Sequence, residues 1–386
     1  MNATKQWLSV LFILTVPMLW SCSADETLQK GGNVLKGDST IYFSVSTDCL
    51  DDVATRNVST RSEAFNSTED FATDGRQFSV CAYRYREDIG EVLMIGSVDG
   101  NTITGATVTC DDDENWTTDE QYYWPQISHT VLFHAAYPVT TFIKTATDVT
   151  FPFDASTDDL GDPMMAYLAM SRSEASEYNY AAPLSFRHAL SQLSFKAVTS
   201  VTGWTLTVRS ITVHNLYNKG TIGIKTGGMK PTNLCLTTDL VTNPSVTFTV
   251  TDNQTDTKNV LPQSRKAWSP EFYTIEENNE LTDTASVGTY IAIECALYDS
   301  SISGYKLGTG TDIDHITEYK TVYCPVDPVW CPNTRFSYTL DFKPPGYGTS
   351  AYNDDGSPIY DVASVSLTAT AITDWSNGGS NTVHVK

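Results

Sequence analysis

The sequence has few basic residues and no long helical pattern. Of its 386 residues, 24 are Lys or Arg and 46 are Asp or Glu, which gives a formal net charge of −22. A surface this acidic repels the phosphates of nucleic acids, so nucleic-acid binding is excluded. No long segment repeats apolar residues at helical spacing, whereas Thr, Ser, Tyr and Val are frequent. This composition indicates an all-β fold.

The motifs of common enzyme families are absent as well. There is no Gly-x-Ser-x-Gly elbow, no His-Glu-x-x-His motif and no glycine-rich loop of the kind that holds phosphate. Asp residues are numerous, but nothing in their spacing singles out a pair of glycosidase carboxylates. We therefore expect a protein that is not an enzyme and needs no cofactor.

The N-terminus reads as an export signal. Lys5 precedes an apolar run that ends at Trp20, and Ser21 and Cys22 follow. The run is too short for a transmembrane helix, and it ends at a cysteine where a secretory signal ends in small residues. We interpret residues 1–21 as a lipoprotein signal, with Cys22 as the lipidated residue that anchors a bacterial envelope protein to its membrane. A plain secretory signal beside an incidental cysteine is the alternative, and both place the chain outside the cytoplasm.

The cysteines do not show the close paired spacing of a zinc site. The chain has eight cysteines, so seven remain beside Cys22, and an odd number in an oxidising compartment leaves at least one unpaired. Two prolines and a tryptophan lie between Cys324 and Cys331. We expect these two to form a local disulfide.

Other metal-ligand patterns are weak. Residues 111–114 are all acidic, but they lack the spacing and the glycine of an EF-hand, so a solvated loop is favoured over a Ca²⁺ site. Asp312, Asp314 and His315 lie close together, yet His315 has no second histidine at strand or helix spacing. His188 falls on the apolar face of a predicted strand, which favours a hydrogen-bonded core histidine. We expect no metal.

The first predicted strand stands apart from the others. Ile41, Phe43 and Val45 alternate with polar residues and share one face. A long polar and acidic stretch follows, which contains Arg56 and Arg61, and regular patterning resumes only near residue 78. Such an exposed stretch is where a protease finds extended substrate.

Many further short strands are predicted from alternating apolar residues. They are residues 78–83, 92–95, 102–108, 130–136, 149–153, 205–213, 246–250, 290–297, 318–323, 336–342 and 362–372. Short strands at this spacing are typical of β-sandwiches. The chain is longer than one hydrophobic core usually organises, so two domains are expected, covering residues 57–182 and 183–386.

One stretch of alternation changes its parity. From Leu184 to Leu190 the apolar residues fall at even positions, and from Leu193 onward they fall at odd positions. Within a continuous strand such a change needs one extra residue. We therefore predict a β-bulge between Leu190 and Leu193.

A series of motifs resembles the fimbrillin family of Bacteroidales-type bacteria. The motifs are Trp116, Tyr123 to Pro125, Leu132 to Pro138, Asp162 to Ala166, Leu184 to Phe195, Pro332 to Tyr338 and Ile372 to Trp375. Their order and spacing, more than any one of them, carry the resemblance.

The resemblance implies two tandem transthyretin-like antiparallel β-sandwich domains and a structural subunit of fimbriae on the outer surface of the cell. It implies a lipoprotein precursor, held in the outer membrane by its lipid until an arginine-specific protease cuts after Arg56 or Arg61. The removed piece would be residues 22–56, with the first strand. A donor strand from residues 362–386 of a neighbouring subunit would fill the groove. Its inserted side chains would include Val365, Leu367, Ala369 and Ala371.

A second function stays open. Trp116, Tyr122, Tyr123 and Trp124 are either an exposed platform that stacks on sugars or part of the core. A platform would favour a glycan-binding or adhesin lipoprotein that does not polymerise, including a fimbrial anchor or tip, with a ligand on a host or bacterial surface.

Overall fold

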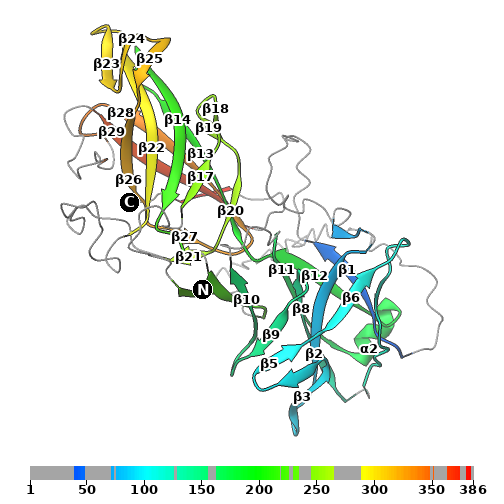
Figure 1. Cartoon of the computed structure of the whole chain (residues 1–386). Coiled ribbons are helices and arrows are strands. Elements are labelled where there is room, and N and C mark those ends of the chain that lie inside the picture. Colours follow the sequence, from blue (N-terminus) through cyan, green and yellow to red (C-terminus); the bar gives the residue numbers. More distant parts are fainter. Residues whose placement is uncertain are drawn as a thin grey trace, which may run out of the picture.

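The computed structural model describes residues 39–47, 71–73, 75–125, 128–154, 162–217, 219–225, 229–233, 245–264, 288–347, 351, 363–373 and 380–383 (Figure 1). Within these residues strands predominate, and the short helices include α2 (Arg172–Ala175) and η1 (Ser176–Tyr178). The predicted all-β fold is confirmed. In the part of the chain so described, no helix has the length and apolar character needed to cross a membrane.

The largest sheet is formed by the N-terminal half of the chain and closes on itself. Its strands are β1 (Tyr42–Thr47), β2 (Gln77–Arg86), β3 (Gly90–Ile95), β6 (Ala106–Cys110), β7 (Trp116–Thr118), β8 (Thr130–Tyr137), β11 (Met164–Ser171) and β12 (Ala181–His188). Their order is β3-β2-β6-β7-β1-β12-β11-β8, and β2 also pairs with β8. The strands from β2 to β8 therefore form a ring, whose interior is filled by Phe78, Phe133, Phe186 and other apolar side chains.

A second sheet combines both halves of the chain. Its strands are β4 (Ser97–Asp99), β5 (Thr102–Thr104), β9 (Thr141–Lys144), β10 (Val149–Asp154), β15 (Lys219–Gly223) and β16 (Met229–Asn233). Strand β15 comes from the C-terminal half and pairs with β10, where the Lys219 ammonium lies 2.6 Å from the Asp154 carboxylate. A separate apolar cluster, which includes Phe142, Phe151 and Ile222, packs beneath this sheet.

The C-terminal half forms two larger sheets and two short ribbons. One large sheet holds β13 (Ser191–Thr199), β18 (Val250–Thr251), β19 (Gln254–Thr255), β20 (Lys258–Val260), β28 (Thr334–Lys343), β29 (Ser364–Thr373) and β30 (Ser380–Val383). The other holds β14 (Trp204–His214), β17 (Val246–Phe248), β22 (Tyr290–Asp299), β23 (Gly304–Leu307) and β26 (Lys320–Pro325). The ribbons pair β21 (Gln263–Ser264) with β27 (Val329–Trp330), and β24 (Thr309–Asp312) with β25 (His315–Glu318). One apolar cluster, which includes Phe195, Ile293 and Leu340, joins the two large sheets.

The sheets are mixed rather than purely antiparallel, which corrects the expectation. Strand β1 runs parallel to β12, and β13 runs parallel to β28. Each of these pairs joins segments that lie far apart in the sequence, so no tight hairpin dictates their direction. Alternation of side chains reveals which face of a strand is buried, but it does not reveal the direction of the neighbouring strand.

The predicted β-bulge between Leu190 and Leu193 is also wrong. Strand β12 ends at His188 and β13 begins at Ser191, and the two belong to different sheets. The change of parity marks the crossing from the N-terminal to the C-terminal sheets through Ala189 and Leu190. The crossing comes after β12, so residues 183–188 still belong to the N-terminal ring.

A buried ion pair lies beside this crossing. The His188 Nδ1 atom is 2.5 Å from an Asp162 carboxylate oxygen, and both side chains are fully buried. The His188 backbone N–H donates to the Asn333 side chain, and the Asn333 backbone N–H donates to the Leu190 carbonyl at 2.9 Å. His188 is therefore a core histidine, as predicted, and its neighbourhood ties the N-terminal ring to the loop before β28.

Replacing Asp162 should destabilise the protein strongly. In Asp162→Ala the His188 imidazole stays buried without its carboxylate, and breaking such a pair costs about 3–5 kcal/mol. The matched control is Asp312→Ala, because Asp312 pairs with His315 at 2.7 Å while their side chains are 53% and 73% exposed. We expect the control to cost less than about 1 kcal/mol in urea unfolding. Equal losses in the two variants would contradict this account.

His134 is a second buried histidine, and it faces the second sheet. In the register of β8 it stands opposite Cys81 on one side and Tyr167 on the other. Its Nδ1 atom has no hydrogen-bond partner among the described residues. Burial lowers the pKa of His134 to about 4, and the Lys144 ammonium contributes in the same direction. The side chain is therefore neutral at pH 7.

This histidine should make the protein sensitive to acid. In the unfolded chain His134 takes up a proton near pH 6.5, whereas the folded protein resists protonation until about pH 4. Neutral His134 therefore makes its full contribution to the free energy of unfolding above pH 6.5. About 3 kcal/mol of this free energy is lost as the pH falls toward 4. Urea unfolding at pH 7 and pH 4.5 should show a smaller pH-dependent loss in His134→Leu than in the native protein. An unchanged loss would show that His134 is not its source.

Candidate functional site: the seat of strand β1

Strand β1 is held on both edges by strands that are distant in the sequence. On one side it pairs in parallel with β12, from Tyr42 opposite Ala181 to Thr47 opposite Phe186. On the other side Phe43 pairs with Trp116 of β7. Just before the strand, the Ile41 backbone N–H donates to the Tyr122 carbonyl at 2.7 Å. Among the described strands, β1 thus joins β7 to β12 in the ring.

The side chains of β1 follow the predicted alternation. Ile41 and Phe43 are only 4% and 6% exposed, and Val45 is half-buried against the same cluster. The Phe43 ring meets Phe78 and Phe133 edge-to-face, with ring centroids 6.2 and 6.0 Å apart. These contacts place Phe43 in the centre of the ring rather than on its surface.

The seat of β1, by which we mean the groove between β7 and β12 that holds residues 41–47, has aromatic walls. Trp116 is buried and stacks on Phe71 at 5.6 Å, and Phe71 also contacts Phe186 at 5.1 Å. Neither Phe71 nor Phe186 was predicted from the sequence to line the groove around β1. Phe186 carried a signal, since it belongs to an alternating strand pattern, whereas Phe71 follows a polar stretch and carried none.

The four aromatic residues considered as a sugar platform divide between core and surface. Trp116 and Trp124 are each 3% exposed, and the Trp124 indole N–H donates to the Tyr180 carbonyl at 2.8 Å. Tyr122 packs against the same cluster, and burial raises the pKa of its hydroxyl, helped by a hydrogen bond to Glu120. Tyr123 alone of the four is well exposed, at 53%. Core packing therefore accounts for both tryptophans.

The expected donor residues lie in the core of the C-terminal half. Val365, Leu367 and Ala369 of β29 are 2%, 8% and 2% exposed, and β29 pairs with β28 along all of its length. The side chain of Ala371 lies outside the described residues. Strand β30 follows β29, lies at the end of its sheet and pairs with β29.

The expected disulfide does not form. Cys324 and Cys331 are both free thiols. Cys324 is buried in the C-terminal cluster while Cys331 is exposed, so the two side chains face opposite environments. Burial raises the pKa of the Cys324 thiol to about 12, which makes it unreactive near neutral pH.

In the two acidic segments, Asp111 and Asp312 accept hydrogen bonds from residues of their own turns. The Asp111 carboxylate accepts hydrogen bonds from the backbone N–H groups of Asp113 and Asn115, at 3.0 and 2.8 Å. Asp312 is similarly engaged by His315 and by the Asp314 N–H. Among the described residues, no three His, Cys, Asp or Glu side chains are arranged to hold a metal ion.

The predicted lipidation site Cys22 and cleavage sites Arg56 and Arg61 lie outside the described residues.

The geometry defines an all-β protein whose first strand is buried between two strands remote from it in the sequence. The seat of β1 is apolar and offers backbone edges, so its chemistry is that of binding a strand. A model of the fimbrillin-like family matches residues 59–350. The chain belongs to the fimbrillin-like family.

The chain is also similar to solved structures of low sequence identity. A fimbrial protein from Bacteroides vulgatus is 14% identical, with a TM-score of 0.46, over 78% of this chain and 94% of that chain. A candidate cell adhesion protein from Bacteroides uniformis is 13% identical, with a TM-score of 0.40, over 89% of this chain and 100% of that chain. The curated proteins contain no match to this chain.

Truncating Phe43 should show how strongly β1 is held. Phe43→Ala removes a ring packed between Phe78 and Phe133 and should lower the free energy of unfolding by about 3–5 kcal/mol. Ser44→Ala, on the opposite face of the same strand, should change it by less than about 0.5 kcal/mol. Chemical denaturation followed by tryptophan fluorescence measures both. A small loss in Phe43→Ala would mean that β1 is dispensable for the ring.

Proposed function

We propose that the protein is a structural subunit of cell-surface fimbriae that assembles by donor-strand exchange and supports adhesion. The fimbrillin-like family supports the fimbrial role and the cell-surface location. The observation that carries the exchange mechanism is the seat of β1, where a short strand fills an apolar groove between β7 and β12. A groove with two backbone edges and an apolar floor accepts another strand in its place.

Proteolysis would start the exchange. In this proposal the precursor is a lipoprotein attached to the outer membrane through Cys22, and cleavage after Arg56 or Arg61 separates β1 from the rest of the chain. Burial of Ile41 and Phe43, with half-burial of Val45, contributes roughly 4–7 kcal/mol, so the cut strand stays bound. It leaves when a competing strand brings more apolar contacts, and this links release from the membrane to growth of the polymer.

The donor is better sought in β30 and the residues around it than in β29. Removing β29 would take Val365, Leu367 and Ala369 out of the C-terminal core. Three such losses would unfold the subunit that donates the strand. Strand β30, at the end of its sheet, leaves at a much smaller cost.

The burial of β29 in the C-terminal core also favours a second candidate function. A subunit whose expected donor strand is fixed in its own core accepts a donor but gives none, which is the behaviour of a terminal subunit. In that role the protein would be a lipid-anchored or tip adhesin, with other fimbrial subunits as partners and a ligand on a host or bacterial surface. Both candidates are non-enzymatic and use no cofactor.

Digestion with an arginine-specific protease separates the two candidates. We expect purified precursor to form a ladder on unheated detergent gels after cleavage, because freed grooves accept strands from neighbouring subunits. The double variant Arg56→Ala/Arg61→Ala should remain monomeric under the same digestion. Excess synthetic peptide with the sequence of residues 39–47 should suppress the ladder by refilling the groove. A cleaved protein that stays monomeric without the peptide would rule out self-polymerisation and leave the terminal role.

A further inference from the structure

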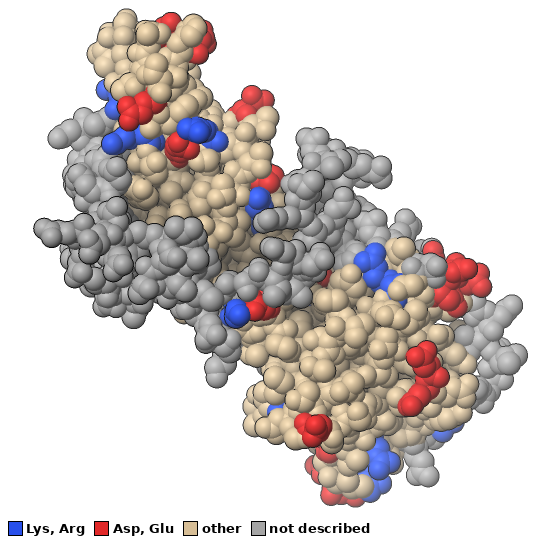
Figure 2. All heavy atoms as spheres, viewed as in Figure 1, with Lys and Arg blue, Asp and Glu red and all other residues tan. Residues whose placement is uncertain are grey.

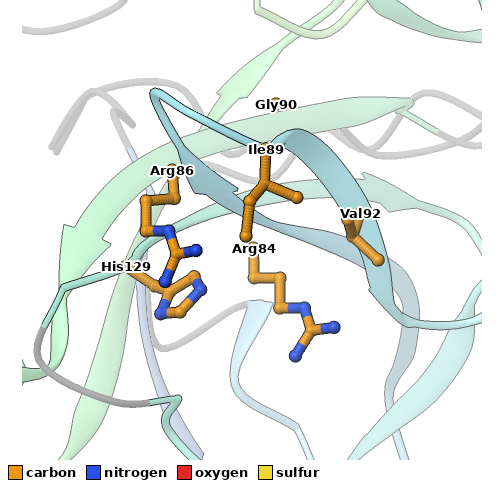
Figure 3. A pocket seen from close by; sticks show the side chains of 6 residues that line it. All are labelled: Arg84, Arg86, Ile89, Gly90, Val92 and His129. Carbon is orange, nitrogen blue, oxygen red and sulfur yellow. The ribbon is translucent and has the colours of Figure 1, made fainter.

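A small cationic cavity lies at the end of the N-terminal ring, far from the seat of β1 in the sheet order. Its volume is about 110 Å³. Figure 3 shows its lining, which consists of Arg84, Arg86, Ile89, Gly90, Val92 and His129. On the face drawn in Figure 2, charged residues stand in small separate groups on a mostly uncharged surface. The chain has a net charge of −22, yet two arginines and no acidic residue are among the residues that line this cavity.

The register of the β2–β3 hairpin builds this cavity. Arg84 and Arg86 are two residues apart on β2, so both side chains emerge on the same side of the sheet (Figure 3). Val92 stands opposite Arg84 and Gly90 stands opposite Arg86. Gly90 has a φ of +78°, and a Cβ atom built there would meet nothing within 4 Å. The turn therefore leaves open space beside Gly90 at the edge of the cavity.

The two arginines differ in their partners. The Arg86 guanidinium is engaged by both carboxylate oxygens of Asp88, at 2.5 and 3.0 Å. The Arg84 side chain is exposed and makes no ion pair or hydrogen bond with any described residue. His129 lies beside Arg86 in the cavity (Figure 3). The Arg84 guanidinium thus offers a planar set of N–H donors that no carboxylate neutralises. Its geometry matches the two oxygens of a carboxylate.

We propose that this cavity binds the carboxylate group of an acidic sugar carried on an otherwise neutral glycan. Its volume corresponds to the space of roughly three or four water molecules, enough for a carboxylate and the carbon that bears it. Ile89, 54% exposed at the rim, and Val92 offer an apolar surface for the ring that stays outside. The inference is independent of strand exchange and adds a ligand to the proposed adhesive role.

The surrounding charges select an isolated carboxylate over a polyanion. Glu87, Asp88 and Glu91 follow the arginines in the same hairpin, and Glu91 is already paired with Lys144 at 2.6 Å. A second acidic group next to the bound one would meet these carboxylates and the negative field of the whole chain. Strongly acidic peptides and nucleic acids are therefore disfavoured, whereas one acid on a neutral frame is not.

Binding can be measured on the intact protein with the methyl glycoside of glucuronic acid as the probe. Heteronuclear NMR titration should show saturable shifts at Arg84 and His129, with a Kd on the order of 1 mM, and none with neutral methyl glucoside. Arg84→Gln should weaken binding at least about fivefold. Arg209→Gln removes an exposed arginine paired with Glu294 in the C-terminal half and should leave binding unchanged.

A gain of affinity gives the sharper test. Asp88→Asn frees the Arg86 guanidinium, so the probe should bind roughly 3–10 times more tightly. A loss of structure at this hairpin would weaken binding instead. Weaker or unchanged binding in Asp88→Asn, or equal binding of neutral methyl glucoside, overturns the proposal. Tighter binding of a glutamate-rich peptide than of the glucuronide would overturn the sugar assignment in favour of a protein partner.

Discussion

The closure of the N-terminal ring by β1 is the constraint on which the rest of the structure depends. Strands β7 and β12 each present one backbone edge to β1, and Phe43 fills the space between Phe78 and Phe133. Without a strand in this place the ring has two unpaired edges and an open apolar interior. Unpaired backbone edges of this kind favour the addition of a strand.

The same device appears a second time in the molecule. The second sheet is completed by β15, which the C-terminal half contributes beside β10. In both places a sheet edge is closed by a segment far away in the sequence. Closure by a distant segment couples parts of the chain that would otherwise fold separately, because neither edge is satisfied until the other segment arrives. The Asp162–His188 pair and Asn333 lie at the crossing from β12 to β13, where the N-terminal ring meets the loop before β28.

Sequence patterns predicted well which face of a strand is buried, but they predicted poorly which strands lie next to each other. The alternation around Phe43 identified which side chains of β1 are buried, and the alternation of Val365, Leu367 and Ala369 identified another buried face. Neither pattern contains the partner strand, so the parallel pairing of β1 with β12 came only from the structure. The parity change after Leu190 was real, but a change of sheet produces it as readily as a bulge does. Cys324 and Cys331 are near in sequence, yet burial separates their environments.

The two apolar clusters of the N-terminal half explain how the groove could open without loss of the fold. The cluster that contains Ile41 and Phe43 fills the ring, whereas the cluster with Phe142, Phe151 and Ile222 contains no residue of β1. Removing β1 therefore takes contacts from the first cluster and leaves the second, with its β10–β15 pairing, in place. Strands β2, β8 and β11 contribute side chains to both clusters. Their contacts in the second cluster would therefore remain after β1 is removed from the first. Strands β7 and β12, which border β1, contribute to the first cluster and not to the second, so β2, β8 and β11 are the part of the ring that depends least on β1.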